Sequence, residues 1–255
     1  MAEKKEQTKK EEYGNQSITQ LKGADRVRKR PAVIFGSDGL EGCAHAVFEI
    51  VSNSVDEAKE GYGNVIRVTR FADRSIEVED DGRGIPMGYN EKEKRYNWDL
   101  IFCELYAGGK YENNKEGSNY GFSLGLNGLG ACATQCASEY MDVRSYSGGI
   151  LSEMHFKKGM PSGKLKETPL TPKEKKHGTV IRWLPDLEVF TDTDIPKEYC
   201  KFLMFFLASS LAAFRRSALY GAFSLKLNRP FLISNVRQPF SSSSTNRHAS
   251  GYFPA

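Results

Sequence analysis

The sequence lacks the features that mark disulfide-bonded, zinc-binding and membrane-spanning proteins. None of its five cysteines belongs to a CxxC pair, and we expect no secretory signal. An odd number of thiols without such a signal is typical of a reducing compartment, so we expect no disulfide, no zinc site and a cytoplasmic location. The most apolar run, Phe202 to Ala213, has about a dozen residues where a membrane span needs roughly 20, which favours a buried helix. The cysteines are Cys43, Cys103, Cys132, Cys136 and Cys200.

A block of charge of one sign is also missing. The chain has 36 Lys and Arg residues against 32 Asp and Glu, which gives a formal net charge of +4, and the excess is scattered. Charge alone therefore does not predict a nucleic-acid-binding surface. A length of 255 residues and a hydrophobic content of 39% are enough for a packed core, in one large domain or two small ones.

The two ends of the chain differ from its middle. Residues 1–12 are almost wholly charged or polar, so they cannot bury enough surface to offset their ordering entropy, and we expect a flexible N-terminal arm over residues 1–16. Residues 219–255 have no clear periodicity, contain a run of four serines and several prolines, and are expected to form an irregular tail. The folded domain is then expected to span residues 17–218.

Within that domain the pattern of apolar residues predicts alternating helices and strands. A helix is expected from Asp38, followed by a hairpin of the runs "NVIRVTR" and "SIEVEDD". A glycine- and asparagine-rich stretch, Gly108 to Gly130, then leads into the apolar "ACATQCA", which reads as a loop that opens a helix. Together these elements predict an α+β sandwich with helices on one face of a sheet. The other expected elements are helices at Trp98 to Ala107 and Pro196 to Ala218, and strands at Tyr140 to Tyr146, Ile150 to Phe156 and Thr179 to Leu184.

The helix that starts near Asp38 carries an unexpected polar face. At about 100° per residue, His45, Glu49, Asn53 and Asp56 lie on one side, and the apolar residues gather on the other. The ordinary interpretation of such a pattern is a solvated outer face. Three further motifs favour a binding site instead.

The first motif is "EDDGRGIP", directly after an alternating strand. Its glycines allow close approach of a ligand, and Asp80 offers an acceptor for an exocyclic amine such as that of adenine, although a polar turn is the plain alternative. The second is "AGGKY" with "GLNGLGA", where backbone amides and Lys110 suit a phosphate, although a mobile surface loop is an equally good interpretation. It lacks the GK[ST] ending of a Walker loop. The third is "HGTVIRWLP", where Thr179 begins a strand and can contact a base through water.

Five segments occur together and in order: "LKGADRVRKRPAVIFGS", "FEIVSNSVDEAKEG", "DDGRGIP", "AGGKYENN" with "GLNGLGA", and "HGTVIRWLPDLEVF". In this combination the chain resembles the ATPase domain of the GHKL superfamily, from about Tyr13 to Arg216. Within that superfamily it resembles the B subunits of bacterial DNA gyrase and topoisomerase IV, which are type IIA topoisomerases. The resemblance implies the two-layer GHKL (Bergerat) sandwich, a mixed β-sheet with helices on one face.

The resemblance also implies roles for individual residues. Glu49 is expected to act as general base and His45 to tune it, and Asn53 to bind Mg²⁺. Asp80 would read adenine, with Thr179 completing a water-mediated network. Glu57 and Arg83 would form a salt bridge beneath the nucleotide. The remaining expected contacts with ATP are Asp56, Gly82, Gly84, Ile85, Pro86, Ile101, Gly109, Lys110, Tyr120, Leu126, Asn127, Gly128, Leu129 and Gly130, with Tyr13 reaching the nucleotide of a partner protomer.

For partners and mechanism, the resemblance implies that ATP closes a lid and stabilises a homodimer, which hydrolysis releases. DNA would be handled through the full enzyme, with a topoisomerase A subunit, and no membrane is involved. Three positions depart from the family pattern: Ser52 replaces an acid, Leu124 replaces a glycine of the lid, and Asn127 replaces the histidine of many gyrases. No transducer domain is recognised after Arg216, so we expect a truncated copy or fragment that binds ATP, hydrolyses it weakly and passes no DNA strand by itself.

Two alternatives remain at this stage. One is another GHKL protein, such as a histidine kinase, a ninety-kilodalton chaperone or MutL. The other is a non-catalytic interaction module that only pairs with full-length subunits. The presence of Glu49 and Asn53 speaks against a fully decayed site.

Overall fold

A computed structural model describes residues 18–107, 128–171, 174, 176–207 and 209, together with the strand at 232–233. Within this part of the chain, none of the helices combines the length and apolar character that a membrane crossing requires. All five cysteines are free thiols.

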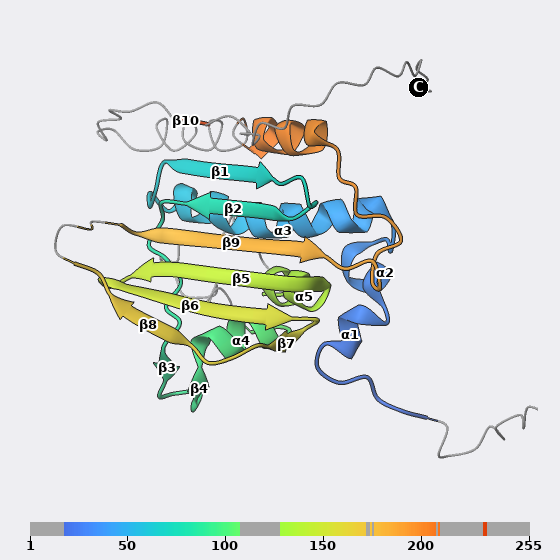
Figure 1. Ribbon diagram of the computed structural model, residues 1–255, viewed down its shortest axis with the longest axis horizontal. Helices are drawn as coiled ribbons and strands as arrows, with labels where there is room; N and C mark the ends of the chain where they lie inside the picture. The colour runs from blue at the N-terminus through green and yellow to red at the C-terminus, as the bar shows by residue number, and fades with distance from the viewer. Residues whose placement is uncertain are drawn as a thin grey trace, which may run out of the picture.

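The centre of the molecule is a mixed sheet with the strand order β10-β1-β2-β9-β5-β6-β7, in which β8 also pairs with β6 (Figure 1). Its pairs are antiparallel except that β10 runs parallel to β1. The strands are β1 (Val65–Arg70), β2 (Ile76–Asp80), β5 (Ser138–Ser147), β6 (Ile150–Lys157), β7 (Met160–Pro161), β8 (Lys166–Pro169), β9 (Gly178–Pro185) and β10 (Leu232–Ile233), with a separate hairpin of β3 (Tyr89–Asn90) and β4 (Arg95–Tyr96).

Helices cover one face of this sheet, and in Figure 1 α3, α4 and α5 lie behind the strands. The helices are α1 (Asp25–Arg28), α2 (Pro31–Phe35), α3 (Leu40–Lys59), α4 (Asn97–Cys103) and α5 (Gly130–Cys136), and residues 197–207 are also helical. This is the α+β arrangement that the sequence predicted. The covered face is called the inner face below, and the opposite one the outer face.

Most of the predicted elements are present, with differences at their ends. The predicted hairpin corresponds to β1 and β2, and the three later strands to β5, β6 and β9. The second helix was predicted to reach Ala107 but ends at Cys103, because Glu104 takes an extended conformation and Tyr106 has a positive φ of 64°. Leu232–Ile233, in the stretch expected to be irregular, pairs with β1. The short elements α1, α2, β3, β4, β7 and β8 were not predicted.

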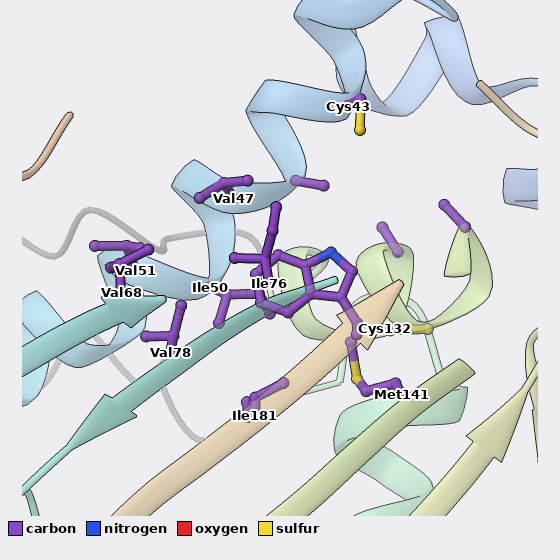
Figure 2. Packing of buried hydrophobic residues seen from close by; sticks show 14 of the residues in the cluster. Cys43, Val47, Ile50, Val51, Val68, Ile76, Val78, Cys132, Met141 and Ile181 are labelled. Atoms are coloured by element: carbon purple, nitrogen blue, oxygen red, sulfur yellow. The ribbon is translucent and has the colours of Figure 1, made fainter. Parts of the chain in front are cut away.

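The inner face is built from consecutive rows of apolar side chains. Trp183, Met141 and Phe156 form one cross-strand row on β9, β5 and β6, and Ile181, Val143 and Met154 form the next. All six side chains are buried. In Figure 2, Val47, Ile50 and Val51 of α3 face Val68, Ile76 and Val78 of the hairpin. Removing each such side chain from water contributes about 1.5–3 kcal/mol, so this contact holds α3 on the sheet.

The outer face of the same strands is covered with charges of alternating sign. Ion pairs on it include Arg67 with Glu79 at 3.2 Å, Arg144 with Glu77 at 3.2 Å, His155 with Asp142 at 2.7 Å and Lys166 with Glu153 at 2.8 Å. Alternation along the strands therefore places most charged side chains on this face, although Val180 is also buried there.

Candidate nucleotide-binding site

At one end of the inner face the apolar rows give way to polar side chains. Asp80 ends β2, Thr179 lies beside it on β9, and Ser145 is the cross-strand partner of Thr179 on β5. These three residues are called the polar row below. Since the strands are in register, the row follows directly after Val78, Ile181 and Val143, and it places a carboxylate and two hydroxyls at the edge of the core.

The carboxylate of Asp80 is held by three donors. Its Oδ1 accepts hydrogen bonds from the backbone N–H groups of Gly82, at 3.0 Å, and Thr179, at 3.2 Å. Its Oδ2 accepts one from the hydroxyl of Ser54 on α3, at 2.8 Å. Burial raises the pKa of Asp80 above its ordinary value, and the three hydrogen bonds oppose this rise. The network fixes the carboxylate in one orientation beside the loop that follows β2.

That loop lies close against β5. Gly84 has a φ of 77°, and a Cβ there would lie 2.5 Å from the carbonyl oxygen of Tyr146, so only glycine fits. Ile85 packs partly against the core. Pro86 is exposed, and Ile101 of α4 is half-buried against the same core. The glycines thus bring the loop and its apolar residues down onto the sheet beside Asp80.

The polar face of α3 is only partly solvated. His45 Nε2 lies 3.1 Å from Glu49 Oε1, and the two side chains are 43% and 26% exposed. Asn53 is half-buried, whereas Asp56 is only 5% exposed. The departure at Ser52 lies on the buried side, where its hydroxyl donates to the carbonyl oxygen of Glu49 at 2.9 Å. The helix therefore presents His45, Glu49 and Asn53 outside the core.

The predicted ion pair between Glu57 and Arg83 is present. Arg83 donates from Nε to Glu57 Oε2 at 3.0 Å and from Nη2 to Oε1 at 2.7 Å, a two-pronged arrangement. Its guanidinium carbon also lies 3.8 Å from the ring centre of Tyr62. Arg83 is therefore held in the plane of one carboxylate and against one aromatic face.

The start of α5 meets the polar face of α3. Gly128 has a φ of 57°, Leu129 precedes the helix, and a Cβ at Gly130 would collide with Glu49 Oε2. Helix α5 thus begins directly against the carboxylate of Glu49. The other predicted residues of this region lie outside the described part of the chain, and so does the arm residue; they are Gly109, Lys110, Tyr120, Leu124, Leu126, Asn127 and Tyr13.

The structure brings eight of the predicted residues into three groups: Asp80 with Gly82 and Thr179, Glu57 with Arg83, and His45 with Glu49 and Gly130. Sequence reasoning missed Ser54, Tyr62, Ser145 and His177, whose Nδ1 donates to the Gly82 carbonyl oxygen at 2.9 Å. The signal for Ser145 was its place in an alternating strand, but only the register of β5 against β9 puts it beside Thr179.

Residues 40–188 match the family described as histidine kinase-, DNA gyrase B-, and HSP90-like ATPase, and the chain belongs to this family. It therefore carries the nucleotide-binding fold of the GHKL ATPases. The chain is 40% identical over 189 residues to the DNA gyrase B protein of Thermotoga maritima, covering 72% of this chain and 28% of the relative. The identity is also 40% with the gyrase B proteins of Enterococcus faecalis, over 185 residues, and Staphylococcus aureus, over 183, again covering 72% of this chain. The chain spans less than a third of the length of these relatives.

Proposed function

We propose that the chain binds ATP with Mg²⁺ and hydrolyses it, as the ATPase region of a topoisomerase protein of the gyrase B type. The observation that carries this proposal is the half-buried carboxylate of Asp80, fixed by Ser54, Gly82 and Thr179 at the end of a largely apolar sheet face. The family match and the similarity to three gyrase B proteins support it.

The donor set fits an adenine nucleotide. Asp80 is an acceptor for the exocyclic amine of the base, and the loop of Gly82, Gly84 and Ile85 offers backbone and apolar surface beside it. Thr179 would contribute its hydroxyl to a water-mediated contact. Arg83, held by Glu57, would lie along the base, with Pro86 and Ile101 as further apolar contacts.

For hydrolysis, Glu49 would accept a proton from the attacking water at its carboxylate, and His45 would hold that carboxylate through its contact at 3.1 Å. Asn53 would bind Mg²⁺ through its amide oxygen, which is a ligand type that this ion takes. The ion, when bound, neutralises phosphate charge. Glycine residues 128 and 130 would bring backbone amides to the phosphates, together with Leu129.

Further expectations concern the whole protein. ATP binding would close the lid, in which Gly109, Lys110, Tyr120, Leu126 and Asn127 are expected, and would favour a homodimer. Tyr13 would reach the nucleotide of the partner. DNA and a topoisomerase A subunit would be partners of the intact cytoplasmic enzyme. This chain alone would hydrolyse ATP weakly and would not pass one DNA strand through another. Residues 17–218 would form the ATPase unit.

The test is a calorimetric titration of the purified chain with a non-hydrolysable ATP analogue and Mg²⁺. We expect binding by the wild type and by Glu49→Gln, and a loss of affinity of about 10- to 100-fold in Asp80→Asn, because a charge-assisted hydrogen bond contributes about 1.5–3 kcal/mol. Glu49→Gln should still bind the ATP analogue but should no longer hydrolyse ATP, because the proposed base is missing. Equal affinity of wild type and Asp80→Asn would contradict the assignment of Asp80 to the base.

A further inference from the structure

Ser145 lies fully buried on β5, in the polar row, and both hydrogen-bonding functions of its hydroxyl go to one residue. Its Oγ accepts a hydrogen bond from the N–H of Ile85 at 2.7 Å and donates one to the carbonyl oxygen of Ile85 at 2.7 Å. A single side chain therefore satisfies both backbone groups of a loop residue, sixty positions away in the sequence. Loss of this hydroxyl would leave the N–H and the carbonyl oxygen of Ile85 without a partner in a partly buried place, which is costly.

Ile85 is the point where the loop after β2 meets the sheet. Upstream, Gly84 has no room for a Cβ between it and Tyr146, and the Gly82 N–H and carbonyl bind Asp80 and His177. Downstream, Pro86 is exposed, and Met87, which is 2% exposed, returns the chain to the core. Between Asp80 and Pro86, the position of the loop relative to the Asp80 carboxylate therefore depends on the bonds at Gly82 and on the hydroxyl of Ser145.

We propose that Ser145 is a positioning residue for base recognition: it holds the Gly84–Ile85 backbone at the distance from Asp80 that lets the loop and the carboxylate contact one adenine ring together. The inference rests on the proposed nucleotide-binding function. Ser145 itself reaches the ligand only through Ile85. Without its hydroxyl, a larger fraction of molecules has the loop displaced, and those molecules hold the base through fewer contacts, so they bind it more weakly and distinguish less between adenine and guanine.

Ser152 is a matched control that the chain provides. It is the cross-strand partner of Ser145 on β6, on the same face of the sheet, and it is 7% exposed. Its hydroxyl lies 3.5 Å from Glu167 Oε1, on the far side from the loop. Replacing either serine by alanine removes the same atom from the same row, but only the change at 145 frees Ile85.

The experiment titrates the full chain and its variants with non-hydrolysable analogues of ATP and of GTP. Ser145→Ala should bind the ATP analogue about 10-fold or more weakly, and the preference for adenine over guanine should shrink, because the loop no longer fixes the base. Ser152→Ala should stay within about twofold of the wild type on both counts. A general loss of stability would lower the affinities for both analogues by the same factor and leave the ratio of the two affinities unchanged.

Two further variants keep the inference testable if Ser145→Ala folds poorly. Gly84→Ala moves the same loop away from β5 while leaving Ser145 intact, and it should reduce the adenine preference in the same way. Ser145→Thr keeps the hydroxyl and should restore the preference. An unchanged preference in both Ser145→Ala and Gly84→Ala would overturn the role of Ser145, whereas a wild-type chain that binds neither analogue would overturn the proposed function and this inference with it.

Discussion

The two faces of the central sheet come from the same strands but hold their polar side chains in different surroundings. On the outer face, charged side chains such as Glu77 and Arg144 pair with one another and remain partly in contact with water. On the inner face, one row that departs from apolar packing holds Asp80, whose carboxylate accepts hydrogen bonds from fixed donors of the protein. A charged group in water is stabilised by the solvent, whereas a charged group removed from water needs hydrogen-bond partners in the protein. The fixed donors around Asp80 therefore distinguish it from the charges of the outer face and make it the candidate for a binding site.

The largest expected effect is the difference in stability between alanine substitutions at two neighbouring residues of β6, Phe156 on the inner face and His155 on the outer face. Phe156 is 2% exposed and packs on Phe102 at a ring distance of 5.5 Å, so Phe156→Ala should lower the free energy of unfolding by about 3–5 kcal/mol. The adjacent His155 points to the outer face, where its side chain is 56% exposed, and His155→Ala should change it by at most about 1 kcal/mol. Urea denaturation of both variants makes the comparison, and similar losses in the two would contradict the two-faced description.

The second expected effect is a gain in stability from Asp80→Asn, the change that we expect to weaken nucleotide binding. The amide oxygen of asparagine still accepts the two backbone N–H groups at Oδ1, and its NH₂ donates to the rotatable hydroxyl of Ser54. Burial of a charge no longer opposes folding. The ligand-free variant should thus have a higher free energy of unfolding than the wild type near neutral pH, measured by denaturation.

The sign of this effect depends on pH. Burial raises the pKa of Asp80, so the folded protein binds its proton more tightly than the unfolded chain does. The resulting stabilisation is fully present below the unfolded pKa and is lost as the pH rises through the folded pKa. The advantage of Asp80→Asn over the wild type should therefore grow across that interval and stay constant above it. A difference that shrinks with rising pH would show that the carboxylate is stabilised in its charged form.

The smallest expected effect comes from Ser54→Ala, which removes one donor from the Asp80 carboxylate. Loss of this partly buried hydrogen bond should lower the free energy of unfolding by about 1 kcal/mol and raise the pKa of Asp80 further. The affinity for the ATP analogue should fall by about fivefold. Ser52→Ala serves as the control on the same helix, since its hydroxyl binds only the carbonyl oxygen of Glu49. Equal affinities for the two variants would remove Ser54 from the network that orients Asp80.

Local patterns predicted the elements that carry most of the site. The helix with His45 and Glu49 and the strand that ends at Asp80 follow from periodicity within a few residues, and they lie where the pattern put them. The predicted pairing of Glu57 with Arg83 also came from recognisable motifs, and the contact is present. Information of this kind is short-ranged, because it depends on neighbours along the chain.

The features that were missed depend on contacts between distant segments. The side of α3 on which Asp56 lies was assigned from a helical wheel, which cannot reveal that the residue is 5% exposed. The roles of Ser145 and Ser54 need the register of β5 against β9 and the placement of α3 over β2. Alternation tells which residues share a face but leaves open which row of one strand meets which row of the next.

Gly130 fixes more than the first turn of α5. Because a side chain there would occupy the place of the Glu49 carboxylate, the helix and the proposed base share one surface, with His45 on the other side of the same carboxylate. The orientation of that carboxylate is consequently set by packing in the folded chain before any substrate arrives. If Glu49 is the base as proposed, little reorganisation of its carboxylate would be needed during the chemical step.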